Sequence, residues 1–131
     1  MWRPYFAILV IAMASFVPSR TSFAAGEPFK ESSLAQVEKQ IADMNGVLKK
    51  FYREISKAKE ENDIHRLNCL VTKLNLIKGL IRASDRAKAV LLDAFYGGDG
   101  ETAKLYKKKV ETYADSVREI ERSLEECRGV K

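Results

Sequence analysis

Apolar side chains recur along residues 34–58 at steps that alternate between three and four. This 3.5-residue repeat puts the apolar side chains on one face of a helix and is typical of coiled-coil packing. Ser32 and Ser33, both good N-cap residues, precede the repeat. We therefore predict a helix over residues 33–59. Its apolar positions are Leu34, Val37, Ile41, Met44, Leu48, Phe51, Ile55 and Ala58.

The repeat is interrupted by Glu-Glu-Asn-Asp at residues 60–63. Because Asn62 or Asp63 can cap a second helix, we predict a tight turn here, followed by a helix over residues 63–96. Neither Gly nor Pro enforces this turn. A continuous helix through residue 62 is the alternative, and it would leave the apolar face of the first segment in need of a partner chain.

The second helix carries two apolar stripes. A helix that is apolar on two sides usually packs against two neighbours, so we expect it in the middle of the bundle. One stripe consists of Leu67, Leu70, Leu74, Ile77, Ile81 and Leu91, and the other of Cys69, Leu76, Leu80, Ala83, Ala87, Val90 and Ala94.

Gly-Gly-Asp-Gly at residues 97–100 is the strongest turn signal in the chain. Asp99 is suited to cap a third helix over residues 100–127, and Gly129 follows at a position typical of a helix C-terminus. The apolar face of this helix again follows alternating steps of three and four. It consists of Ala103, Tyr106, Val110, Tyr113, Val117, Ile120, Leu124 and Cys127.

Together these elements predict an all-α fold, an elongated antiparallel three-helix bundle built from coiled-coil-like hairpins. In an antiparallel hairpin centred on the Gly-rich turn, residues equally far from Gly98 face each other. Cys69 and Cys127 are such a pair, and they are the chain's two cysteines. We therefore predict that they form a disulfide that clamps the bundle.

The N-terminus has the order of parts of a secretory signal peptide. Arg3 precedes an uncharged apolar run over residues 5–17, and small residues flank Phe23 before a cleavage site expected after Ala24, or else after Ala25. The alternative is a membrane anchor, but the run of about 13 residues is short of the roughly 20 needed to span. We predict a signal-peptide helix at 1–24, a flexible segment at 25–32 and a helical domain at 33–129.

The net charge of the chain does not favour a nucleic acid partner. The whole chain carries +5, and removal of the leader, with its two arginines and no acids, leaves 21 basic and 18 acidic residues, a net charge of +3. Proteins that bind nucleic acids normally show a clustered basic face, so we expect no nucleic acid partner. We expect a secreted or periplasmic protein without a stable membrane anchor after cleavage.

The candidate chemistry is sparse. The single histidine, His65, lies four residues before Cys69, so the two share a helix face on which zinc is conceivable only if the cysteines are reduced. A Ser–His–Asp arrangement would also depend on His65, and no nucleophile stands out. We predict no catalytic, metal-binding or cofactor-binding residues, and hence a protein that is not an enzyme.

Two features are candidates for an interaction. Phe95 and Tyr96 adjoin the glycine turn, where the end of a bundle covers aromatic side chains poorly. Lys107, Lys108 and Lys109 form the densest cationic run. Such a run is usually a solvated helix face, and its functional alternative is contact with an anionic envelope surface or an acidic protein. A homodimer through the apolar face of the first helix is also consistent with the sequence.

The segments that contain the two cysteines, and one segment between them, are similar to segments of known proteins. Arg-Leu-Asn-Cys at 66–69, Ile-Lys-Gly-Leu at 77–80 and Glu-Cys-Arg-Gly at 126–129 resemble a group of exported helical bacterial proteins without an assigned function. This resemblance implies a setting in the bacterial envelope and no activity. We expect a non-enzymatic structural or interaction protein; the alternatives are a periplasmic holdase-type chaperone and an envelope carrier of a ligand or metal.

Overall fold

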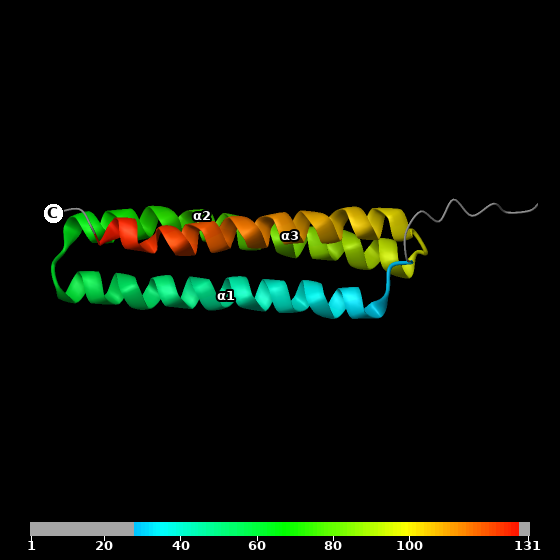
Figure 1. Ribbon diagram of the computed structural model, residues 1–131, viewed down its shortest axis with the longest axis horizontal. Coiled ribbons are helices and arrows are strands. Elements are labelled where there is room, and N and C mark those ends of the chain that lie inside the picture. Colours follow the sequence, from blue (N-terminus) through cyan, green and yellow to red (C-terminus); the bar gives the residue numbers. More distant parts are fainter. Residues whose placement is uncertain (1–27, 129–131) are drawn as a thin grey trace, which may run out of the picture.

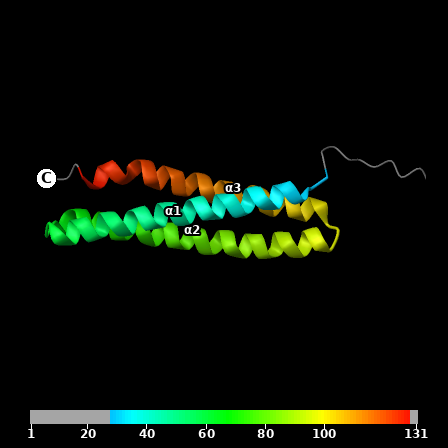
Figure 2. The ribbon, with the colours of Figure 1, turned by 90° about the horizontal axis from the view of Figure 1, so that it is seen from below.

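The computed structural model describes residues 28–128. The predicted signal peptide and the start of the segment at 25–32 lie outside the described residues, as does Gly129. Within 28–128 the chain forms helices α1 (Glu31–Glu60), α2 (Ile64–Tyr96) and α3 (Gly100–Arg122), and a terminal 3₁₀ helix η1 (Ser123–Cys127). They lie side by side along one long axis, with α2 antiparallel to both α1 and α3 (Figures 1 and 2).

The core of the bundle follows the predicted apolar repeats. Six of the eight positions predicted for the first helix are buried, and Leu34 and Leu48 are partly buried against the same core. In α3 the predicted positions are likewise buried or partly buried, and the repeat missed Ala114, which is also buried. The fully buried side chains of largest volume are Phe51, Met44, Leu70, Ile77, Leu91, Val37, Val110 and Val117.

The start of α1 differs from the prediction. The helix begins at Glu31, and its N-cap residue is Lys30, which makes no side-chain capping hydrogen bond. Ser32 and Ser33 are therefore first-turn residues, and the cap predicted for them is wrong. The backbone N–H of Ser33 donates to the carbonyl oxygen of Lys30 at 2.9 Å, so the helical turn itself satisfies this donor.

The turn between α1 and α2 is present, and the continuous-helix alternative is wrong. Asn62 takes a left-handed backbone conformation with φ of 52°, a conformation that asparagine tolerates better than most residues. Asp63 is the N-cap of α2, and its carboxylate accepts a hydrogen bond from the backbone N–H of Arg66 at 3.0 Å. An asparagine and a capping aspartate thus make the reversal that neither Gly nor Pro enforces.

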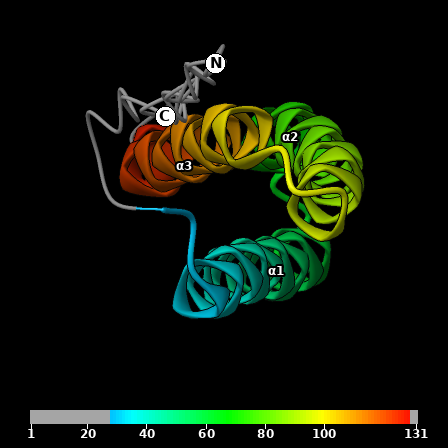
Figure 3. The same cartoon turned by 90° about the vertical axis from the view of Figure 1, so that its right-hand side faces the viewer.

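Helix α2 packs against both neighbours, as its two stripes predicted, but it does not lie between them. Viewed along the axis, the three helices occupy the corners of a triangle (Figure 3), and α1 also contacts α3. The first stripe of α2 fills the centre of this triangle. The second stripe is divided, because Ala87 is buried while Leu76 and Val90 are exposed.

The α2–α3 hairpin closes through residues 97–99. Gly98 adopts a φ of 79°, a left-handed conformation that glycine reaches without steric cost. Asp99 caps α3 as predicted, with its carboxylate accepting from the backbone N–H of Thr102 at 3.1 Å and from the Thr102 hydroxyl at 2.6 Å. No helix within residues 28–128 is long and apolar enough to cross a membrane.

The C-terminal end differs from the predicted α-helix over residues 100–127. The α-helix ends at Arg122, and the chain continues to Cys127 as a more tightly wound 3₁₀ helix. The Ser123 hydroxyl donates to the carbonyl oxygen of Ile120 at 2.7 Å and accepts from Lys73 Nζ at 2.7 Å. A side-chain hydroxyl that donates to a backbone carbonyl competes with the α-helical hydrogen bonds of that turn. Such competition favours the change from an α-helix to a 3₁₀ helix, which is common at helix ends.

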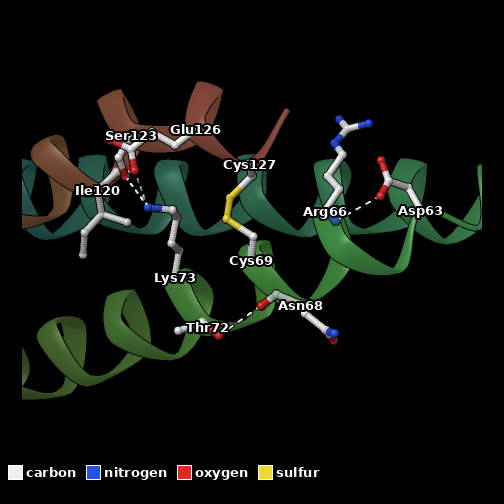
Figure 4. The surroundings of a disulfide bond; sticks show 10 residues. All are labelled: Asp63, Arg66, Asn68, Cys69, Thr72, Lys73, Ile120, Ser123, Glu126 and Cys127. Carbon is white, nitrogen blue, oxygen red and sulfur yellow. Dashed lines mark hydrogen bonds and ion pairs between the residues drawn. A yellow bond between two sulfur atoms is a disulfide. The ribbon is translucent and has the colours of Figure 1, made fainter. Parts of the chain in front are cut away.

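The predicted disulfide is present. Cys69 of α2 and Cys127 of η1 are joined with an S–S distance of 2.06 Å and a Cα–Cα distance of 5.5 Å (Figure 4). One turn further along α2, Lys73 reaches toward Ser123 and Glu126, so a polar contact flanks the covalent one. Both cysteines of the chain are in this bond.

Reduction of the disulfide should lower the melting temperature markedly. The bond closes a loop with a sequence separation of 58 residues, and the chain-entropy model assigns such a loop about 4 kcal/mol of stabilisation. Thermal unfolding followed by circular dichroism with and without reductant measures the change. The Cys69→Ser, Cys127→Ser double variant should melt with the reduced protein, whereas two reactive thiols in the native oxidised protein would refute the bond.

Candidate interaction surface

The end of the bundle near the α1–α2 turn is held by a buried carboxylate. Glu54 projects from α1 with only 8% of its side chain exposed, and it accepts hydrogen bonds from Arg66 of α2 and from Arg128, just after the disulfide. Lys57 donates to its other oxygen at 3.3 Å. One carboxylate therefore joins α1 to the two segments that the disulfide links.

The environment of Glu54 favours its ionised form. Burial by itself raises the pKa of this carboxyl, but hydrogen bonds from Lys57, Arg128 and Arg66 outweigh it and lower the pKa below its usual 4.5. Arg66 is itself largely buried, and its second terminal nitrogen donates to Glu61 at 3.0 Å. The sequence pattern did not reveal this cluster, because a glutamate beside a helical seam is ordinarily a solvated charge.

The predicted aromatic tip is only half formed. Tyr96 is 78% exposed at the end of α2. Phe95 is partly buried against the core and meets the ring of Phe29 edge-on, with centroids 5.4 Å apart. Phe95 therefore serves to hold the chain just before α1, and Tyr96 is the exposed member of the pair.

The predicted lysine run does not form one patch. Successive residues of a helix point in directions about 100° apart, so the three side chains diverge. Lys107 lies toward the start of α1 and pairs with Glu111 at 3.1 Å. Lys109 lies on the opposite side, toward α2, with its Nζ 4.3 Å from the centre of the Tyr106 ring. Lys108 lies between Leu105 and Thr112 on the outer surface of α3.

A further candidate site is a groove between α2 and α3 on the side away from α1, which we call the outer groove. Residues equally far from Gly98 face each other across it, so Ala83 lies opposite Tyr113 and Val90 opposite Tyr106. The hollow lies where the small side chain of Ala83 faces Tyr113. Its lining comprises Ala83, Arg86, Ala87, Val90, Tyr106, Lys109 and Tyr113, with a volume of about 320 Å³.

The groove continues outward over α3, where Leu105, Lys108 and Thr112 line an adjoining hollow of about 310 Å³. Leu105 is 54% exposed, Val90 is 39% exposed, and Leu76, two turns before Ala83 on the same face of α2, is 56% exposed. Both hollows are open to solvent and near the lower limit of volumes typical of small-molecule pockets. They suit the side chains of a larger partner better than a complete small ligand.

Sequence reasoning detected part of this surface and assigned it otherwise. The second apolar stripe of α2 was attributed entirely to packing against a neighbouring helix, whereas only some of its members are covered. Arg86 and Leu105 were missed, because neither belongs to a predicted apolar repeat. The signal available in the sequence was an excess of apolar positions over the number that two neighbouring helices can cover.

The sequence offered one candidate metal site, at His65. Within residues 28–128, no three histidine, cysteine or acidic side chains are grouped so that they could hold a metal ion. His65 is exposed near the start of α2. The zinc site considered at His65 and Cys69 also lacks its cysteine ligand, because the sulfur atom of Cys69 is in the disulfide.

Comparison of the chain with known protein families, with curated proteins and with solved structures yields no match. The resemblance carried by the cysteine-bearing segments therefore stays a prediction. The function has to be argued from the residues of this chain.

Replacing Glu54 by Gln should destabilise the protein by about 1–3 kcal/mol, because buried hydrogen bonds to charged partners are lost and Arg66 keeps its charge. Since the folded-state pKa of Glu54 is lowered, its contribution is present above the unfolded-state pKa and is lost as the pH falls through the folded-state value. Chemical denaturation between pH 7 and about pH 3 should therefore show that the free energy of unfolding falls less steeply with decreasing pH in the variant than in the parent.

Glu60→Gln is the matched control, because Glu60 is an exposed carboxylate on the same helix without an ion pair among the described residues. It should change the unfolding free energy by less than about 0.5 kcal/mol. Equal losses of unfolding free energy in the two variants would contradict the role assigned to the Glu54 cluster. So would a Glu54→Gln variant whose unfolding free energy falls with decreasing pH as steeply as that of the parent.

Proposed function

We propose that this chain is an exported, non-enzymatic interaction protein whose outer groove binds a protein partner. The observation that carries the proposal is the exposure of Leu76, Val90 and Leu105 along one side of the bundle. Single exposed apolar side chains are ordinary, but Val90 and Leu105 line two adjoining hollows, and exposed apolar side chains gathered at a hollow mark a surface that another molecule covers. The groove itself adds tyrosine walls, and tyrosine is enriched at binding hot spots.

The rest of the bundle supports a binding role by its rigidity. The disulfide joins α2 to the end of α3, and Glu54 ties α1 to both. Because the walls of the groove are held in one arrangement before a partner arrives, little conformational freedom is lost on binding. We further propose that the protein works in the periplasm or outside the cell, where a disulfide persists.

A holdase-type chaperone is the second candidate, and the same exposed aliphatic side chains favour it. A holdase shields many unfolded chains, whereas an interaction protein binds one partner or a few. A ligand carrier is less well supported, because the groove is shallow and open rather than enclosing. The two leading candidates therefore differ in the number of proteins that reach the groove.

Photo-crosslinking in the cell should separate them. A benzoylphenylalanine at position 105 or 90 should form adducts with the same protein, because both positions border the outer groove. Position 49, which is exposed on α1, is the matched control and should give no such adduct. Mass spectrometry identifies the adducts: a broad set of proteins favours the holdase, and equal labelling from all three positions would contradict binding at the groove.

Export makes a separate prediction. If residues 1–24 are a signal peptide, the protein recovered from outside the cytoplasm should begin at Ala25, or at Gly26 if cleavage follows Ala25. N-terminal sequencing or intact-mass measurement decides between these. A recovered chain that still begins at Met1 would argue for the membrane-anchor alternative.

A further inference from the structure

We infer that the outer groove binds an amphipathic helix with acidic side chains flanking its apolar face, and that the bound helix packs against α2 and α3 on the side away from α1. This inference rests on the proposed function and specifies the chemistry of the partner. It is drawn from the shape of the groove, from its apolar lining and from the unequal pairing of the cations around it.

The shape suits a helix. The walls are two antiparallel helices, and a further helix laid along the groove would pack against both of them, as neighbouring helices of a bundle do. From Leu76 to Val90 the face runs for about 21 Å at 1.5 Å per residue, which matches four turns of a bound helix. Along this length, Ala83 and Ala87 leave the depth that side chains of an incoming helix need, in the manner of knobs entering holes.

The lining is apolar at its centre and positive at its edges. Arg86 borders the groove on the α2 side and Lys109 on the α3 side, while Lys108 lies beside the adjoining hollow. A helix that presents aliphatic side chains to Ala83 and Val90 would therefore bring its flanking positions close to these cations. Carboxylates at those positions would be attracted, and ammonium groups would be repelled.

The pairing of the cations points in the same direction. Lys88 pairs with Glu38 of α1, Lys104 with Glu101 and Lys107 with Glu111. Among the described carboxylates, none forms an ion pair with Arg86, Lys108 or Lys109. These three lysines are thus neutralised within the bundle. The three cations around the groove are not neutralised by a described carboxylate, although Lys109 also lies over the Tyr106 ring, so a carboxylate of a partner can pair with them.

Other occupants fit less well. A second copy docked groove to groove would bring two grooves with positively charged edges together, because a two-fold interface uses the same surface of both copies. The predicted leader carries two arginines and no acids, so its charge also opposes the groove. A flat anionic membrane would meet the rim, at Leu105 and Lys108, but could not reach the partly buried tyrosine walls.

The test uses two synthetic helical peptides of about 18 residues, long enough to cover the groove. Both carry leucine at alternating steps of three and four; one has glutamate and the other lysine at the flanking positions. Fluorescence anisotropy with the oxidised full chain should show binding of the glutamate peptide at least about tenfold tighter than of the lysine peptide. The difference should shrink at about 0.5 M salt, where the screening length is only a few ångströms.

Two sets of variants locate the binding. Ala83→Leu fills the groove and should weaken binding of the glutamate peptide about tenfold, as expected when a docking position is lost. Ala89→Leu makes the same change at an exposed position of α2 and should bind like the parent. The exchange Arg86→Glu, Lys109→Glu should reverse the preference between the peptides without depending on packing, and unchanged thermal unfolding confirms that each variant is folded.

Equal binding of the two peptides, or equal effects of Ala83→Leu and Ala89→Leu, would overturn the inference. So would groove-dependent binding to anionic phosphatidylglycerol vesicles in place of the peptide, or a dimer in sedimentation that Ala83→Leu dissociates. These failures differ from failure of the proposed function: a single crosslinked partner at positions 90 and 105 without selectivity for the glutamate peptide leaves groove binding in place and removes only the acidic helix.

Discussion

The covalent link between Cys69 and Cys127 sets the register of α2 against α3, and the outer groove depends on that register. With Gly98 at the turn and the two sulfur atoms at the far end, α3 cannot slide along α2 by a helical turn without breaking one of these constraints. A slip would move Ala83 away from Tyr113 and Val90 away from Tyr106 and would change the lining of the groove. The pairs of residues that form the groove therefore depend on the clamp.

The charges of the bundle are divided between internal and external roles. Glu54 uses Arg66 and Arg128 to hold α1 against the clamped end, and several lysines pair with nearby carboxylates of the bundle. Arg86, Lys108 and Lys109 have no such partners among the described residues. Part of the positive charge of the molecule therefore lies at the groove, where an acidic partner would meet it beside apolar side chains.

Most of the fold could be predicted because it depends on short-range patterns. Alternating steps of three and four fixed which face of α1 and α3 is buried, and the glycine turn located the hairpin. The errors lie at helix ends, where side-chain competition decides: a capping serine was expected at the start of α1, and an α-helix was expected through Cys127. The helix α1 begins after Lys30 without a side-chain cap, and at the other end the Ser123 hydroxyl donates to the carbonyl oxygen of Ile120.

The sequence by itself determined that three helices form, which faces are apolar, and that two cysteines meet across a hairpin. It did not determine which apolar side chains stay uncovered, since a stripe on α2 looks the same whether a neighbour covers it or not. Only the triangular arrangement decided that Leu76 and Val90 face outward beside Arg86, and that Glu54 is enclosed by cations from distant parts of the chain. Burial depends on all three helices at once, and no local pattern contains that information.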